Sequence, residues 1–380
     1  MSVKTLWLLA VVAVAIGVAA TVVSRNPRYT PDGFQYSRIA MQDAGLSPAD
    51  ALLKAEAFYI QKPIGRIPRY REFLTVDVAH APPAPGPIFR TRVLYPFVAS
   101  IVYRWRGLAA LADVSLVAFI AGVLLIYWLL LALARPWVAA AGAVLFGISP
   151  LILVLAESDV TDMLALTLWI GALASALHYM QSARRSWILT FAFAALLLAY
   201  TRQAIYLPIG VVAGAFIGAR MRRDIDDIVR STALAAVLGC VVAINSIWYV
   251  LMHGAGLAKE LEIAHGLAIR GGSESPDEPL GSWYRRTVIG NAVAECKRAI
   301  LNVLPVLALI AAVLEIRRRE TAILIGAAIA GLAPLFLDPS SSALPRVLEA
   351  PLYPVVLAGL AIGAERLLRR SLAGQQQSVT

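Results

Sequence analysis

This sequence of 380 residues has little charge and few of the side chains that crosslink proteins or hold metals. Charged residues make up 15% of it, whereas soluble domains carry about a quarter. Its two cysteines, Cys240 and Cys296, lie in or beside apolar segments, so we expect neither a disulfide framework nor a thiolate metal site. The four histidines show no metal-ligand spacing. These absences argue against a disulfide-rich secreted domain and a Cys/His metal protein.

The motifs of common soluble enzymes are also missing. The sequence contains no P-loop, no dinucleotide-binding glycine fingerprint, no H-E-x-x-H and no D-D-x-x-D pair. The net charge of +10 would suit nucleic acid, but the arginines fall in short clusters between apolar segments. Membrane topology and acidic lipid headgroups explain that distribution better, so we expect membrane lipids and no nucleic acid as partners.

Long apolar runs are abundant. Hydrophobic residues make up 59% of the chain, and its mean hydropathy is +0.72, which indicates an integral membrane protein. Runs of about 17 to 24 apolar residues are long enough to cross a bilayer. The prediction is an all-α polytopic protein with about ten spans. They lie near residues 5–23, 111–133, 137–156, 161–180, 186–200, 203–219, 231–252, 296–315, 321–337 and 347–365.

Basic residues are distributed unevenly among the connections between these spans. One side has Lys4, Arg135, Arg184, Arg185, Arg220, Arg222, Arg223, Arg230, Arg317 to Arg319, Arg366, Arg369 and Arg370. The short turns on the other side contain Glu157 and Asp159, then Arg202, then Arg346. Because short basic loops stay in the cytoplasm, we expect both termini there, in a multi-pass protein of the cell membrane.

This topology divides the chain into five parts. They are a retained anchor at 1–23, an extracytoplasmic loop at 24–110, spans two to seven at 111–252, a second such loop at 253–295, and the last three spans with a cytoplasmic tail at 296–380. Within the first loop, "SPADALLKAEAFY" is typical of a short amphipathic helix capped by Ser47. "RVLYPFVASIVYRW" is too short to span, so we expect an interfacial helix on the outer leaflet.

Charged residues at membrane depth need a partner or a water-filled cavity, and the predicted topology brings several to the outer surface. From the first loop come Asp32, Arg90 and Arg92, with the uncharged Tyr95 beside them; from later turns come Glu157, Asp159, Asp162, Arg202 and Arg346. Carboxylates and guanidiniums at one depth are the groups needed to act on an anionic lipid headgroup.

Five motifs occur in an informative order along the chain. "PDGFQYSRIA" follows the first span, "RTRVLYP" precedes the second, "AESDVTD" forms an acidic outer turn, "AYTRQAIY" precedes a proline-containing span, and "LPRVLEAPLYPVVLAGLA" opens the last span. In motif order and topology the chain resembles the GT-C integral membrane glycosyltransferases, which include protein O-mannosyltransferases and lipid A aminoarabinose transferases. It departs from them in length and in Gly33, which follows Asp32 where the family often has a second acidic residue.

The resemblance implies a GT-C-like fold and transfer of a sugar from a polyprenyl-phosphate carrier to a glycan, lipid or protein acceptor outside the membrane, with inversion. It assigns Asp32 as general base. Arg202 and Arg346, or alternatively Arg90 and Arg92, would hold the phosphate. Glu157 or Asp159 would orient the acceptor or bind a divalent cation, although no metal is expected to be obligatory. Tyr36 and Tyr95 are candidates for stacking on the sugar.

Each of these residues also has a purely structural interpretation. Asp32 forms a good helix-capping turn, Glu157 and Asp159 are suited to cap the next span, and Asp162 is expected to pair with a basic residue inside the bundle. Arg346 is also suited to reach lipid headgroups, and Tyr36 to an aromatic belt. Two other functions stay open: a transporter or flippase of lipid-linked saccharides, and a polysaccharide polymerase or ligase.

Overall fold

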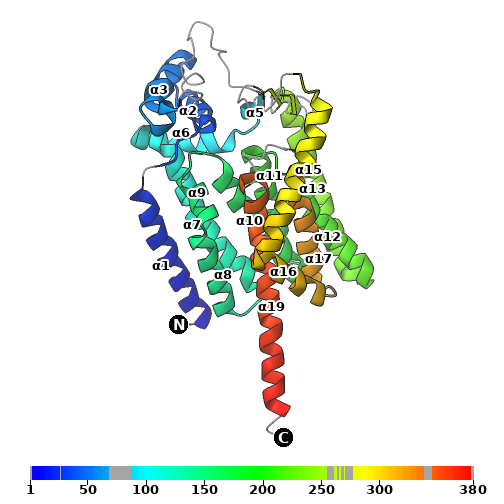
Figure 1. The fold of residues 1–380 in the computed structure, drawn as a ribbon. Coiled ribbons are helices and arrows are strands. Elements are labelled where there is room, and N and C mark those ends of the chain that lie inside the picture. Colours follow the sequence, from blue (N-terminus) through cyan, green and yellow to red (C-terminus); the bar gives the residue numbers. More distant parts are fainter. Residues whose placement is uncertain are drawn as a thin grey trace.

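The apolar runs fold into a helical bundle, and the first loop forms a cap of short helices on one end of it (Figure 1). The computed structural model describes residues 2–25, 27–67, 87–254, 261–262, 265–266, 269, 277–337 and 345–377. The bundle contains α1 (Val3–Val23), α7 (Ala110–Leu131), α8 (Pro136–Ile148), α9 (Pro150–Glu157), α10 (Asp162–Ser182), α11 (Arg185–Thr201), α12 (Tyr206–Arg222), α13 (Ile225–Leu251), α15 (Leu280–Leu301), α16 (Val303–Leu314), α17 (Arg319–Gly331), α18 (Pro334–Leu337), η3 (Pro345–Glu349) and α19 (Ala350–Gln377). The cap contains α2 (Pro31–Asp43), α3 (Pro48–Ile60), η1 (Pro63–Arg66), α5 (Pro87–Arg90), α6 (Leu94–Arg106) and η2 (Gly107–Ala109).

The chain is a multi-pass membrane protein with fewer full-length spans than the ten predicted. In the described ranges, 6 helices are long and apolar enough to cross a membrane, or up to 8 if each of two bent pairs forms one span. Helices α11 and α12 occupy the predicted spans at 186–200 and 203–219, but each has 17 residues. They meet at Arg202, which is extended (φ −154°, ψ 145°), so the predicted division there is confirmed.

Two predicted spans are broken rather than continuous. The segment at 137–156 forms α8 and α9, bent by 56° at Ser149, because Pro150 has no backbone N–H and favours an extended residue before it. The predicted span at 296–315 is interrupted, because the chain turns by 85° between α15 and α16. Asn302 caps the new helix there, and its side-chain oxygen accepts from the N–H of Leu304 at 3.2 Å.

Small residues bring α12 and α17 close together. Gly210, Gly214 and Gly218 recur every fourth residue on α12 and face Gly326 and Ala322 of α17. A Cβ on Gly210 would overlap the backbone of Gly326, and one on Gly214 would overlap the carbonyl of Ala322. Such contact between backbones is a common way to pack helices in lipid, where hydrophobic burial gives little driving force.

The cap places α2 and α6 directly over the bundle (Figure 1). Helix α6 covers the segment predicted to be interfacial. It exposes Phe97, Ile101 and Trp105 and ends at Gly107, whose φ of 58° favours glycine. Its position at the membrane surface stays a prediction. Helix α3 begins at the predicted cap, where Ser47 accepts from the N–H of Asp50 at 3.1 Å. Both termini lie at the end of the bundle opposite the cap (Figure 1). Which membrane side each end faces stays a prediction.

Candidate functional site

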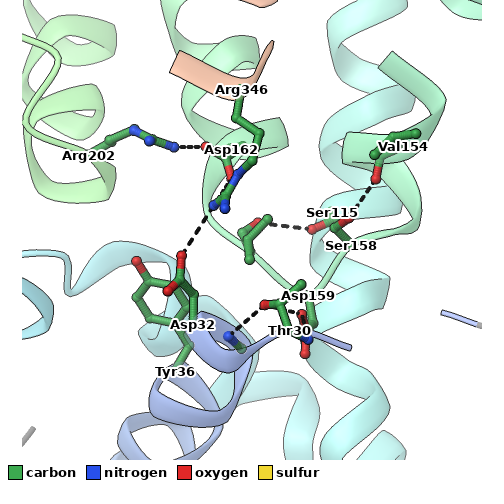
Figure 2. Close-up of polar contacts among 12 residues, drawn as sticks. Thr30, Asp32, Tyr36, Ser115, Val154, Ser158, Asp159, Asp162, Arg202 and Arg346 are labelled. Atoms are coloured by element: carbon green, nitrogen blue, oxygen red, sulfur yellow. Dashed lines mark hydrogen bonds and ion pairs between the residues drawn. The ribbon is translucent and has the colours of Figure 1, made fainter. Parts of the chain in front are cut away.

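Asp32 lies in the first turn of α2, where the cap meets the bundle. Thr30 caps this helix by accepting from the N–H of Gly33 at 3.0 Å, and Pro31 fixes the backbone of the first turn. Figure 2 shows the Asp32 carboxylate directed at Arg346, with its Oδ2 3.3 Å from Nη2 of the arginine. The Asp32 side chain is 38% exposed, so the carboxylate is oriented by protein and still open to solvent.

Asp162 joins the two arginines of the predicted outer turns. Its Oδ2 accepts from Nε of Arg346 at 2.8 Å and from Nη2 at 2.6 Å, and its Oδ1 forms an ion pair with Arg202 (Figure 2). The Asp162 side chain is 1% exposed, and two guanidiniums compensate for its burial. The expectation that Asp162 pairs with a basic residue inside the bundle is confirmed. Asp32, Arg346, Asp162 and Arg202 therefore form one continuous row of alternating charges.

A pocket lies beside this row, between α10, α11, α12 and the start of α19. Its polar lining comes from Asp162, Arg202 and Arg346, and most of the remaining wall is apolar. That wall consists of Ala165, Leu166, Trp169, Leu198, Ala204, Tyr206, Leu207 and Pro351. The Trp169 indole donates to the Pro351 carbonyl at 2.9 Å, which joins α10 to α19 at the pocket wall. Guanidiniums next to apolar surface suit a ligand with an anionic group attached to a hydrocarbon.

Glu157 and Asp159 connect the turn between α9 and α10 to the chain that leads into α2. Glu157 accepts from Arg25 and Arg28 at 3.0 Å each, and the Arg28 N–H donates to the Glu157 carbonyl at 2.8 Å. Asp159 Oδ1 accepts from the backbone N–H and the hydroxyl of Thr30, at 3.0 and 2.9 Å. Both carboxylates are buried and position the segment that carries Asp32.

Asp159 also belongs to a buried hydrogen-bond network with α3. The Tyr59 hydroxyl donates to Asp159 Oδ2 at 2.6 Å and lies 2.9 Å from the Ser37 hydroxyl. Burial raises the pKa of Asp159 to about 7, although the hydrogen bonds from Tyr59 and Thr30 oppose the shift, and the nearby charge of Asp32 adds to it. This carboxyl group therefore changes protonation near neutral pH, directly beneath the helix turn that carries Asp32.

Gly33 is required by the position of Asp159. A Cβ at position 33 would overlap the Asp159 carboxylate, so no side chain can follow Asp32 on this turn unless Asp159 moves. The glycine at position 33 thus has a physical reason. The space beside residue 33 is taken by a carboxylate that comes from another part of the chain.

We expect Gly33→Ala to lower the free energy of unfolding by about 1–3 kcal/mol, because the added methyl group overpacks a buried polar contact. The loss should shrink sharply when Gly33→Ala is made in an Asp159→Ala background, which removes the clashing carboxylate. Thermal unfolding of the four proteins of this cycle measures the coupling. Gly17→Ala in α1, where a Cβ meets nothing within 4 Å, is the matched control and should cost nothing. Equal losses from Gly33→Ala in both backgrounds would contradict this explanation.

The remaining predicted site residues lie on the loop between α5 and α6 and on neighbouring helices. Arg90 ends α5 and is half-buried, and Arg92 Nη1 lies 3.4 Å from the Tyr36 hydroxyl. Gln203 donates to the Thr91 hydroxyl at 3.1 Å, so this loop is held against the turn that carries Arg202. The loop therefore lies close to the row of charges, whereas the role of Arg90 and Arg92 in binding phosphate stays a prediction.

The aromatic side chains expected to stack on a sugar are buried in protein. Tyr36 is 1% and Tyr95 0% exposed, and their rings pack edge-to-face with centroids 5.7 Å apart. Tyr36 also packs on Phe89, and the Tyr95 hydroxyl donates to the Leu111 carbonyl at 2.7 Å. Neither ring presents an open face, so these contacts favour a core role over sugar stacking.

Across the residues that the structure describes, no group of three or more His, Cys, Asp or Glu side chains is arranged to hold a metal ion. Glu157 and Asp159, the residues expected to bind a divalent cation if one is used, are occupied by Arg25, Arg28, Thr30 and Tyr59. The independence from metal stays a prediction.

Several residues that build the site were not predicted from the sequence. Thr30 and Tyr59 hold Asp159, and Arg25 and Arg28 hold Glu157. Ser47 and Pro48 predicted the helix that carries Tyr59. Within that helix, the position of Tyr59 on the apolar face is typical of an ordinary core residue. Its partner lies 100 residues away in the sequence, so no local signal identifies the contact.

No family model matches this sequence, and no curated protein matches it. Among solved structures, the fold is similar to the crystal structure of ArnT from Cupriavidus metallidurans in the apo state, with a TM-score of 0.52 and 20% sequence identity. The similarity covers 95% of this chain and 60% of the ArnT chain, so this chain spans less than two thirds of ArnT. The protein is thus a multi-pass membrane protein whose fold is similar to that of ArnT.

Proposed function

We propose that this protein is a membrane glycosyltransferase. It moves a sugar from a polyprenyl-phosphate-linked donor to the hydroxyl of a glycan, lipid or protein acceptor at the extracytoplasmic face. The observation that carries this proposal is the contact between the Asp32 carboxylate and Arg346, at 3.3 Å, beside a pocket that also contains Arg202. A base and two phosphate-binding side chains next to an apolar wall are the groups this reaction requires.

In the proposed reaction, the acceptor hydroxyl attacks the anomeric carbon from the face opposite the phosphate. Asp32 takes the hydroxyl proton as the new carbon–oxygen bond forms. The bond from the anomeric carbon to the phosphate oxygen breaks, and its electron pair leaves with the polyprenyl phosphate. Arg202 and Arg346 stabilise the charge that develops on that phosphate, and the configuration at the anomeric carbon is inverted.

Asp162 keeps the two guanidiniums in place for this task. Because it contacts both arginines and is buried, it fixes their positions whether or not phosphate is bound. Arg346 is shared between Asp162 and Asp32, and the phosphate competes with Asp32 for that guanidinium. Donor binding therefore releases Asp32 from its ion pair and makes its carboxylate available to the acceptor.

The cavity measures only about 20 Å³, so it would have to widen to admit the first isoprene units of the carrier against its apolar wall. Leu166, Trp169, Leu198 and Leu207 line it next to the guanidiniums. Polar residues at one end of the bundle favour chemistry at a membrane surface over transport, which commonly uses a binding site near the midplane.

The test is to incubate the purified protein in nanodiscs with radiolabelled polyprenyl-phosphate sugars and a membrane-lipid acceptor extract. We expect donor-dependent transfer of the label with inversion at the anomeric carbon, and the same rate in EDTA. Vesicles loaded with lipid-linked saccharide provide the comparison. Saturable movement across these vesicles without any transfer would contradict the proposal and favour the transporter.

A further inference from the structure

The end of the bundle opposite Asp32 contains a second pocket, lined mostly by arginine. It lies where α16 ends, where the chain turns into α17, and where α19 extends beyond the bundle (Figure 1). Its lining residues are Glu315, Arg318, Arg366, Arg369 and Arg370. Four guanidiniums and one carboxylate share this pocket, so it carries a surplus of positive charge.

The carboxylates nearby compensate for only part of that charge. Arg366 is structural, because it pairs with Glu315 at 2.9 Å and donates to the Leu314 carbonyl at the end of α16. Arg369 is 3.2 Å from Glu365, which also binds Arg135 at 3.3 Å. Arg318 reaches Glu320 only at 3.9 Å.

Arg370 is the most available of the four cations. Its side chain is exposed, and it forms no ion pair with any residue in the described ranges. Together with Arg318 it provides guanidinium groups for an anion from outside the chain. Planar guanidiniums match the geometry of phosphate oxygens and keep their charge when partly dehydrated.

Apolar surface beside the pocket indicates that the anion is attached to a hydrocarbon. On α16, exposed side chains include Leu309 (64%), Ile310 (49%), Val313 (59%) and Leu314 (55%), and on α19 Leu367 is 69% exposed. These side chains suit contact with hydrocarbon, and they lead along the bundle to the arginines. A soluble phosphate would use the arginines alone, whereas a phospholipid would use both surfaces.

We propose that this pocket binds the phosphate headgroup of an anionic phospholipid, whose acyl chains lie along the exposed face of α16. Basic pockets between helices at the cytoplasmic surface are suited to such headgroups, and the predicted orientation places this end there. The site is separate from the one around Asp32 and does not depend on the proposed transferase activity.

The test measures binding of short-chain phosphatidylglycerol, short-chain phosphatidylcholine and inorganic phosphate to the purified full-length protein. The key variant is Arg318→Gln/Arg370→Gln, which leaves Arg366 in place to hold α16. The matched control is Arg184→Gln/Arg185→Gln, which removes two exposed arginines from another connection at the same end of the bundle. We expect phosphatidylglycerol to bind the wild type and the control alike, and the key variant roughly tenfold or more weakly.

The other outcomes would overturn the proposal. Equal binding of phosphatidylglycerol to all three proteins would mean general attraction to a basic surface. Inorganic phosphate binding as tightly as phosphatidylglycerol would mean a soluble-anion site without a lipid. If the double variant does not fold, Arg370→Gln alone decides the question, because that exposed side chain holds no described element in place, and unchanged affinity in this variant would also overturn the proposal.

Discussion

Asp32→Asn is expected to lower the turnover number for sugar transfer about a thousandfold, within the range of roughly 10²–10⁴ typical of a general base. Asparagine has the shape of aspartate and preserves the start of α2, but its amide cannot accept the acceptor's proton. Turnover with saturating donor, measured in nanodiscs at neutral pH, gives the comparison.

Donor affinity distinguishes this loss from a general defect of the site. Asp32 and the donor phosphate compete for Arg346 in the proposed mechanism, so Asp32→Asn should leave donor binding unchanged or tighter. Asp43→Asn is the matched control, since Asp43 is an exposed carboxylate at the far end of the same helix. Wild-type turnover in Asp32→Asn would remove this residue from the catalytic role, whereas equal losses in both variants would point to damage to α2.

Arg346→Gln is expected to weaken donor binding about ten- to a hundredfold, because a charged hydrogen bond contributes roughly 1.5–3 kcal/mol. Arg202→Gln should have an effect of the same kind, because Arg202 also pairs with Asp162 and lines the same pocket. Arg346→Lys keeps the charge without the planar fork and should restore only part of the affinity. Equilibrium binding of a fluorescent polyprenyl phosphate measures all three variants.

Stability must be measured beside affinity, because both arginines also neutralise Asp162. Each single variant leaves Asp162 one guanidinium, so we expect a modest drop in the unfolding temperature, whereas Asp162→Asn should alter both arginines at once. Arg106→Gln provides a control with the same loss of charge at the same end of the bundle, in an exposed pair with Asp113. Unchanged donor affinity in both Arg346→Gln and Arg202→Gln would show that these arginines serve only to join the helices.

The helices were largely predictable because hydropathy is a property of short segments. Helices α1, α7, α10 and α13 lie close to the predicted spans. Helix α6 is short, as expected for a segment that does not span the membrane. Two predicted spans are broken where a single residue interrupts an apolar run, at Pro150 and at Asn302. Asn302 caps a new helix inside an apolar run, and hydropathy averaged over that run does not register the break.

The candidate site was predictable in its members but only partly in its contacts. The predicted topology placed Asp32, Arg202 and Arg346 at one end of the bundle, because alternating spans bring alternate turns to the same side. It did not indicate that Asp159 would occupy the space beside Gly33, or that Tyr36 and Tyr95 would pack on each other.

The sequence alone determined that this is a multi-pass membrane protein, approximately where its helices lie, and that charged turns gather at one end. Each of these depends on composition within a short window. Tertiary structure decided which charges pair. Asp162 takes both arginines, and Arg346 reaches Asp32 across 314 positions of sequence. Such contacts depend on how helices pack and rotate against one another to within a few ångströms, and the order of residues along one chain does not specify that by local rules.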